Sequence, residues 1–442
     1  MKHLYELTAV ELRKLLAAGE ITAEGLTRHY LLRIDKYDQS RGLNTVAFFD
    51  PTALEQAKKL DKRRDRQALP LFGLPVLIKD NIDVSGLPTT AGSRTLVDNI
   101  ARKDAPIVAN LRKKGAIILG KTNMTEFANY TADQMPNGFS SRGGQVRNAY
   151  DPTVDPSGSS TGSAVAVSAG FCAAAIGTDT SFSIVGCATQ NGVAGFKPGC
   201  GSLPSKGIIP IATTVDMAGP LTHNVADAML LYSGLRNKPF HVPPAHVKGL
   251  CIGINTFGME EVPQSQLGRY QALLDGLQQD GARVRQMNHP YSPHQRIIQR
   301  CEFKEDLEAY LADTSVVRCT LEKIIRGYKA DPEVRMPYGI DILEMAMAHS
   351  RTLPDYAEAM AERQKARAAL LEELREVDAC IMTGPTNIMH FAGLPSVALP
   401  LAMAPDGTPR GIILYGADEK RLLAAAQVVE RYCPGVTAPC FA

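Results

Sequence analysis

The sequence predicts an α/β layered protein, in which strands and helices alternate along the chain and pack as a sheet covered by helices. Short apolar runs that suit buried strands alternate with segments whose apolar residues recur at three- and four-residue spacing, as in amphipathic helices. The 442 residues suffice for a large buried core. Residues 290–375 differ, because they are charged, helical in pattern and contain less glycine. We therefore predict one domain over 1–442, with its core at about 1–240 and 376–442 and a helical cap inserted at about 290–375.

The N-terminal part predicts helices followed by the first buried strand. Residues 7–37 suit two helices, with Thr8 and Thr22 as the capping residues. A polar helix is expected at 51–68, and the apolar run Leu71–Ile78 predicts a buried strand. The next elements are a helix and a strand, Ile107–Lys114 and Ala116–Leu119.

The middle of the chain is rich in small residues. Residues 131–163, dense in Gly, Ser, Asn and Pro, predict a long loop, and a loop of this length is usually functional or disordered. A helix at Ser160–Phe171, a strand at Ala173–Gly177 and a second small-residue stretch at Ser181–Lys197 follow. So many small residues indicate that backbones approach closely here.

The C-terminal half returns to alternating strands and helices. The predicted strands are Leu250–Asn255, Ala282–Met287, Ala379–Met382, Val397–Leu401 and Gly411–Tyr415. The predicted helices are 263–279, Asp355–Arg375 and Glu419–Arg431.

Amino-acid composition indicates which binding partners and which cellular compartment to expect. The 48 basic and 46 acidic residues give a net charge of +2, which offers no electrostatic footprint for nucleic acid or an anionic membrane. The nine cysteines show no C-x-x-C spacing and suit free thiols in a reducing compartment. The N-terminal residues lack the apolar core of a signal peptide, and no apolar run is long enough to span a bilayer. We expect a cytoplasmic monomer or homodimer without nucleic-acid or membrane partners.

Three local features could carry chemistry. Lys79 lies at the end of an apolar strand, where desolvation would lower its pKa and allow a neutral, basic amine. Ser157–Ser163 is a hydroxyl-dense turn that opens a helix, and Gly177–Ser183 is a turn whose backbone N–H groups can converge on an anion. Alone, each feature is more often structural: an ion-paired lysine, a helix cap or an ordinary turn.

Other catalytic and nucleotide-binding classes lack their motifs. The chain has no phosphate-binding G-x-x-x-x-G-K-[ST] spacing and no G-x-S-x-G elbow. Its nine histidines form no H-E-x-x-H or similar cluster, so we predict no metal site. His223 is the only histidine near the three features along the sequence, and a surface or capping role is expected for it.

Together the three features resemble the amidase signature family. Its members carry a lysine in I/V-K-D, then G-G-S-S-[GS]-G-S, then G-T-D/E-T-x-G-S-I. The matching segments are Ile78–Asp80, Ser157–Ser163 and Gly177–Ile184, and Ser159 and Ser183 stand 24 positions apart, as in the family. Further matching segments, Gly73–Val76, Gly120–Phe127, Gly195–Pro198, Asp216–Pro220 and Gly393–Ser396, extend the resemblance over nearly the whole chain.

The resemblance implies a fold and a set of roles. The fold is a mixed, twisted sheet with helices on both faces. Neutral Lys79 is the base, Ser159, after a cis peptide bond, relays the proton, and Ser183 is the nucleophile. The implied oxyanion hole consists of the backbone N–H groups of Thr180, Ser181, Phe182 and Ser183. The implied reaction hydrolyses a carboxamide C–N bond through an acyl-enzyme, without a cofactor, to give an acid and ammonia or an amine.

The resemblance also implies a class of substrate. Met135–Gln145 and Ala188–Gly192 resemble a subgroup that includes bacterial peptide amidases, so we expect a small-molecule or peptide amide as substrate. The candidate substrate contacts are Met135, Asn137, Gly138 and Val185.

Phe182 departs from the family pattern, which has small residues or glycine just before the nucleophile. If this position needs a positive φ, a bulky residue is strained there. Three functions therefore stay open. The chain is a stand-alone amidase, an A-type component of a tRNA-dependent transamidation complex, or a catalytically impaired relative that binds a ligand or partner.

Overall fold

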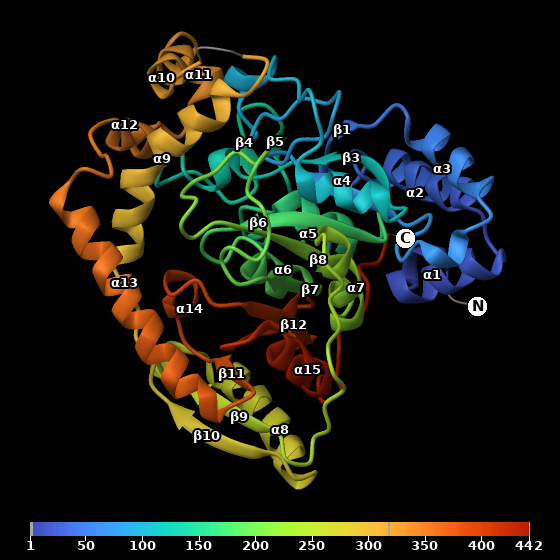
Figure 1. Cartoon of the computed structure of the whole chain (residues 1–442), viewed down its shortest axis with the longest axis vertical. Coiled ribbons are helices and arrows are strands. Elements are labelled where there is room, and N and C mark those ends of the chain that lie inside the picture. The colour runs from blue at the N-terminus through green and yellow to red at the C-terminus, as the bar shows by residue number, and fades with distance from the viewer. Residues whose placement is uncertain (1–2, 317–318, 442) are drawn as a thin grey trace.

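The computed structural model describes residues 3–316 and 319–441. Within these residues, eleven strands form one mixed, twisted sheet through the centre of the molecule (Figure 1). From one edge to the other, the strands are β1 (Val46–Phe49), β3 (Ile117–Thr122), β2 (Pro75–Lys79), β6 (Ala174–Asp179), β8 (Met217–Thr222), β7 (Ala194–Lys197), β12 (Ser396–Met403), β13 (Pro409–Tyr415), β11 (Ala379–Met382), β9 (Cys251–Asn255) and β10 (Arg283–Met287).

Helices cover both faces of the sheet, as the sequence predicts. Two short helices of small residues, α5 (Thr161–Ser168) and α6 (Val185–Asn191), pack side by side against its central strands. The remaining helices outside the region 290–375 are α1 (Ala9–Ala18), α2 (Ala23–Tyr37), α3 (Ala53–Asp61), α4 (Pro106–Lys113), α7 (Val225–Leu235), α8 (Gln264–Gln279), α14 (Ile388–Phe391) and α15 (Glu419–Glu430).

The caps of the first two helices are confirmed. The Thr8 hydroxyl accepts a hydrogen bond from the Glu11 N–H at 3.1 Å, and the Glu11 carboxylate accepts one from the Thr8 N–H at 2.8 Å. This reciprocal pair is a capping box. The Thr22 hydroxyl accepts a hydrogen bond from the Gly25 N–H at 3.0 Å. Local side-chain chemistry thus fixes where α1 and α2 begin.

The region 290–375 is helical, as predicted. Its helices are α9 (His294–Ala312), α10 (Leu321–Lys329), α11 (Pro332–Arg335), α12 (Asp341–Met347) and α13 (Pro354–Glu373). The long helices α9 and α13 pack against each other at one side of the molecule (Figure 1). The division of the chain into a core and an inserted cap stays a prediction.

Some elements differ from the sequence-based expectation. The helix expected at 51–68 ends at Asp61, and the strand expected from Leu71 begins at Pro75. Strands β1 and β8 and helix α7 were not predicted. The strand β8 reads Met-Ala-Gly-Pro-Leu-Thr, and its Gly and Pro disfavour a central strand by propensity. It forms nevertheless, because β6 and β7 lie on either side and pair with it.

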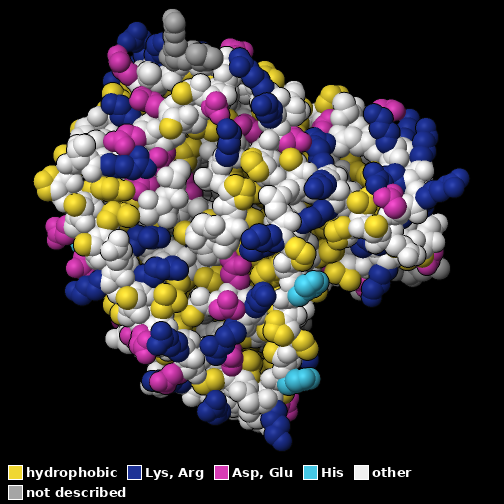
Figure 2. Space-filling view, in the orientation of Figure 1, with side chains coloured by type: hydrophobic (Ala, Val, Ile, Leu, Met, Phe, Trp, Pro, Cys, Tyr) yellow, Lys and Arg dark blue, Asp and Glu magenta, His cyan; other side chains and the backbone are white. Residues whose placement is uncertain are grey.

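The surface and the cysteines match the compositional expectations. Basic and acidic side chains are interspersed on the face shown in Figure 2. All nine cysteines are free thiols, although Cys440 is exposed rather than buried. Among the residues that the structure describes, no helix combines the length and the apolar composition needed to cross a membrane.

Candidate active site

The sheet brings Lys79, the turn Ser157–Ser163 and the turn Gly177–Ser183 together at the carboxyl ends of two of its strands. β2 and β6 are parallel neighbours, with Ile78 opposite Ile176, so their carboxyl ends lie together. Lys79 is the last residue of β2, and the turn Thr180–Ser183 directly follows β6. Helix α5 starts at the same edge, which places Ser159 between the two. Parallel pairing is therefore what gathers residues that are far apart in sequence.

The side chains of Lys79, Ser159 and Ser183 form a continuous hydrogen-bonded path. Lys79 Nζ donates to Ser159 Oγ at 2.8 Å, and Ser159 Oγ lies 3.1 Å from Ser183 Oγ. The Gly158–Ser159 peptide bond is cis, as the family resemblance implies. Lys79 and Ser159 are fully buried, whereas Ser183 retains 5% exposure. Only the last hydroxyl of the path is therefore open to a second reactant.

The environment of Lys79 favours a neutral amine. Desolvation by burial lowers the pKa of the Lys79 amine from 10.5 to about 7, although nearby Cys187, Asp179 and Asp216 act in the opposite direction. Lys79 Nζ also lies 2.9 Å from Ser160 Oγ and 2.9 Å from Thr178 Oγ1. These hydroxyls fix the position of the amine without contributing a formal charge. Near neutral pH, a substantial fraction of Lys79 can therefore act as a base.

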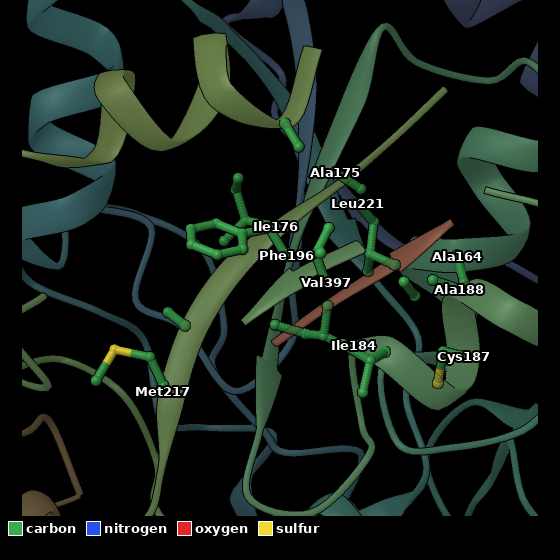
Figure 3. Close-up of a cluster of buried hydrophobic side chains, with 14 of the residues drawn as sticks. Ala164, Ala175, Ile176, Ile184, Cys187, Ala188, Phe196, Met217, Leu221 and Val397 are labelled. Carbon is green, nitrogen blue, oxygen red and sulfur yellow. The ribbon is translucent and has the colours of Figure 1, made fainter. Parts of the chain in front are cut away.

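Buried apolar side chains pack directly behind the turn Thr180–Ser183. Ile184, the residue after Ser183, belongs to a fully buried cluster with Ile176, Ala164 and Val397 (Figure 3). The cluster also contains Cys187, which interacts electrostatically with Lys79. This packing excludes water from one side of the site and accounts for the desolvation of the amine.

The turn from Thr180 to Ser183 presents unpaired backbone donors. Within residues 3–316 and 319–441, none of its four N–H groups has a hydrogen-bond acceptor. The next two N–H groups, of Ile184 and Val185, instead donate to Asp179 Oδ2 at 2.7 and 3.2 Å. Asp179 therefore holds the far end of the turn, and the free N–H groups can serve a bound anion or carbonyl oxygen.

Comparison with known proteins identifies the family to which this geometry belongs. The family model described as Amidase matches residues 25–387. The chain belongs to the amidase family. It is 30% identical to a probable amidase of Arabidopsis thaliana, over 97% of this chain and 90% of that protein. The solved peptide amidase from Stenotrophomonas maltophilia superposes with a TM-score of 0.90 at 30% identity, covering 99% of each chain.

A second group of relatives within the amidase family consists of amidotransferase subunits. The A subunit of the glutamyl-tRNA(Gln) amidotransferase of Thioalkalivibrio sulfidiphilus is 31% identical, over 96% of this chain and 96% of that protein. Membership of the amidase family confirms the resemblance inferred from the motifs and indicates an enzyme that acts on amides.

His390 is the main site residue of this amidase that sequence reasoning missed. It lies on α14, is fully buried, and places Nδ1 3.3 Å from Asp179 Oδ1. Burial lowers the pKa of His390, whereas the adjacent Asp179 carboxylate raises it. Burial opposes ionisation of Asp179, but His390, Lys197 and the Ile184 N–H lower the pKa of that carboxyl to about 2. Sequence reasoning missed His390 because it lies far from the three motifs along the chain.

Phe182 adopts the left-handed conformation that the sequence left in question, with φ of 68°. Its ring packs edge-to-face on the His390 ring at a centroid distance of 4.4 Å. Such a contact contributes about 0.5–1.5 kcal/mol. That is comparable to the cost of about 1–2 kcal/mol for a left-handed L-residue. A buried histidine thus offsets the strain of a bulky residue at this position.

The conformation of Phe182 gives a prediction about stability. Phe182→Gly and Phe182→Ala both remove the ring, but only glycine adopts a positive φ without strain. The glycine variant should therefore have the larger free energy of unfolding, by about 1 kcal/mol, in urea titrations. At Phe49, which lies in strand β1 and is 49% exposed, the same two substitutions should rank in the opposite order. An alanine variant at 182 as stable as the glycine variant contradicts this account.

The four candidate substrate contacts have different environments in the structure. Asn137 accepts a hydrogen bond from Asn129 at 2.8 Å and donates one to Asp155 at 2.9 Å. The Gly138 N–H donates to Thr125 Oγ1 at 2.8 Å. A Cβ atom built on Gly158 would lie 2.6 Å from both Asn137 Oδ1 and Thr125 Oγ1, so these residues support the segment before Ser159.

The other two candidates differ from each other in exposure. Met135 is partly exposed in the long loop, where a substrate could reach it. Val185 is fully buried in the hydrophobic core, which argues against its expected contact with substrate.

A cavity of about 450 Å³ lies beside the turn Thr180–Ser183. Ser181 lines it together with Asn129 and Tyr130, which precede the long loop, and Gln295 from α9. The first turns of α9 thus reach the turn that follows β6, which the sequence did not indicate. A second cavity that contacts the turn, at Thr180, is much smaller.

Proposed function

We propose that this protein is a serine hydrolase that cleaves a carboxamide C–N bond through an acyl-enzyme on Ser183. The observation that carries the proposal is the buried path from Lys79 through Ser159 to Ser183, with steps of 2.8 and 3.1 Å. A pKa of about 7 for the Lys79 amine supplies the base that such a path needs. Serine and lysine can together replace the histidine of other serine hydrolases.

In the acylation step, neutral Lys79 takes a proton from Ser159 Oγ while Ser159 takes one from Ser183 Oγ. Ser183 Oγ then attacks the amide carbonyl carbon. The carbonyl oxygen becomes negative and is held by the free N–H groups of residues 180–183, in the manner of an oxyanion hole. Two consecutive short proton transfers thus generate the nucleophile without a charged intermediate in bulk solvent.

Breakdown of the tetrahedral intermediate reverses the direction of the proton. Lys79, now protonated, returns a proton through Ser159 to the nitrogen of the scissile bond, which leaves as ammonia or an amine. Water then enters, loses a proton along the same path and attacks the ester carbonyl. The C–O bond to Ser183 breaks as Lys79 returns the proton through Ser159 to Ser183 Oγ, the carboxylic acid departs and the free enzyme is restored.

The test is a hydrolysis screen with a direct readout of the leaving group. Primary amides, anilides, peptide amides and ureido acids should be offered, and release of ammonia or amine measured. A fluorophosphonate should label Ser183, as located by mass spectrometry of the digested protein. A folded protein that is neither labelled nor active on any of these substrates contradicts the proposal and favours a catalytically impaired binding protein.

The relatives named as A subunits of glutamyl-tRNA(Gln) amidotransferase support a second candidate function. In that case the chain would act as one component of a transamidation complex and release ammonia from glutamine. Co-purification with the other components, together with glutaminase activity in the complex, distinguishes this function. It would also overturn the expectation that nucleic acid is not a partner.

A further inference from the structure

Two residues that line the cavity beside the turn Thr180–Ser183 each carry a buried polar atom that has no protein partner. Within the described chain, these are Gln295 Oε1 and the Tyr130 hydroxyl oxygen. Gln295 is 2% exposed and Tyr130 is 7% exposed. A buried polar atom without a partner is uncommon, and in a native structure it indicates strain, an ordered water or a bound molecule. Two residues of one cavity lining that carry such atoms are consistent with a polar molecule bound beside them.

The orientation of the Gln295 side chain is fixed by one hydrogen bond. Gln295 Nε2 donates to the Thr180 carbonyl oxygen at 2.8 Å. Because a carbonyl oxygen can only accept, the nitrogen must face Thr180 and Oε1 must face away from it. Gln295 therefore presents an acceptor beside a turn whose own free groups are N–H donors.

The acceptor of Gln295 and the free N–H donors of the turn that Gln295 contacts are together complementary to a carboxamide. Its carbonyl oxygen accepts hydrogen bonds and its nitrogen carries N–H groups. An ester of the same acid has the carbonyl oxygen but no N–H. A site that provides an acceptor for a substrate N–H discriminates strongly against an analogue without it, because the buried acceptor stays unpaired.

We infer that Gln295 Oε1 accepts a hydrogen bond from the N–H of the scissile carboxamide, and that Gln295 thereby selects amides over esters of the same acyl group. This inference rests on the proposed function and adds a specificity-determining residue to it. The hydrogen bond from Nε2 to Thr180 gives Gln295 a second, positioning role toward the turn.

The experiment compares a primary amide with the methyl ester of the same acyl group, using an amide that the wild-type enzyme hydrolyses. Gln295→Met keeps the length of the side chain but removes both polar groups. The loss of the contact with Thr180 affects both substrates, whereas the loss of the acceptor affects the amide alone. The ratio of kcat/KM for amide over ester should therefore fall by about tenfold or more.

Two further variants separate the two roles. Gln295→Glu retains an acceptor oxygen, so its amide-to-ester ratio should stay within about threefold of the wild-type value even if both rates fall. Lys304→Met, on the same helix but outside the lining of this cavity, is the matched control and should leave the ratio unchanged. Thermal unfolding and fluorophosphonate labelling of Ser183 confirm that each variant is folded. If Gln295→Met does not fold, Gln295→Leu provides the same comparison.

The outcomes are distinct. If amide and ester rates fall in parallel in Gln295→Met, or if neither falls, Gln295 does not bind the substrate N–H and the inference is overturned. If the wild-type protein hydrolyses no amide and Ser183 is not labelled, the proposed function itself fails. Hydrolysis of the amide by wild type with an unchanged ratio in the variant refutes the inference alone.

Discussion

Ser183→Ala and Lys79→Met should each lower kcat for amide hydrolysis by about 10⁴- to 10⁶-fold, as expected when a nucleophile or its base is removed. Ser183 provides the only hydroxyl of the path with exposed area, so no neighbouring atom can replace it. Lys79→Met fills the buried site with an apolar side chain but cannot accept a proton. Initial rates of ammonia or amine release, measured at high enzyme concentration, give the magnitude.

Ser181→Ala is the matched control for this pair of variants. Ser181 lies in the same turn, two residues before Ser183, but its side chain belongs to the cavity lining rather than to the hydrogen-bonded path. Its kcat should remain within about tenfold of wild type, and fluorophosphonate should still label Ser183. Near wild-type turnover in Ser183→Ala or Lys79→Met, with a native unfolding transition, would falsify the assignment of the path.

The second large effect is the dependence of the rate on pH. Lys79 acts as a base only when neutral, and its pKa is about 7. Below that pH the amine is protonated, so kcat/KM should fall about tenfold for each unit of decrease in pH. Above it, the neutral form dominates and the rate should reach a plateau. Initial rates between pH 5 and pH 9, with activity regained on return to pH 8, check this profile.

The assignment of the acidic limb to Lys79 needs a control, because burial also raises the pKa of Asp216 to about 7. The Asp216 carboxyl accepts a hydrogen bond from the Thr180 hydroxyl at 2.6 Å, so it contacts the nucleophile turn. The limb should persist in Asp216→Asn but move to lower pH, because the Asp216 carboxylate, which raises the pKa of Lys79, is lost in this variant. A profile without a limb in wild type, or a limb that disappears in Asp216→Asn, rules out Lys79 as the titrating base.

The sequence alone determined the parts of this protein that depend on local chemistry. Apolar runs and capping residues located most strands and helices, since burial and capping depend on a few neighbouring side chains. The ordered motifs also identified the family and predicted three catalytic side chains, Lys79, Ser159 and Ser183. Among the elements that were missed are β1, β8 and α7; in β8 local propensity was overridden, because its Gly and Pro are tolerated between paired strands.

Only the tertiary structure decided which distant residues complete the site. His390 and Gln295 lie on helices α14 and α9, and neither carries a sequence pattern that marks it as part of the site. His390 contacts Phe182, and Gln295 contacts Thr180, because their helices pack over the turn after β6. Likewise, the pKa of Lys79 depends on water being excluded by packing from β6, α5 and α6. Motifs specify which groups are present, whereas distances, burial and unpaired donors arise only when the sheet and its helices assemble.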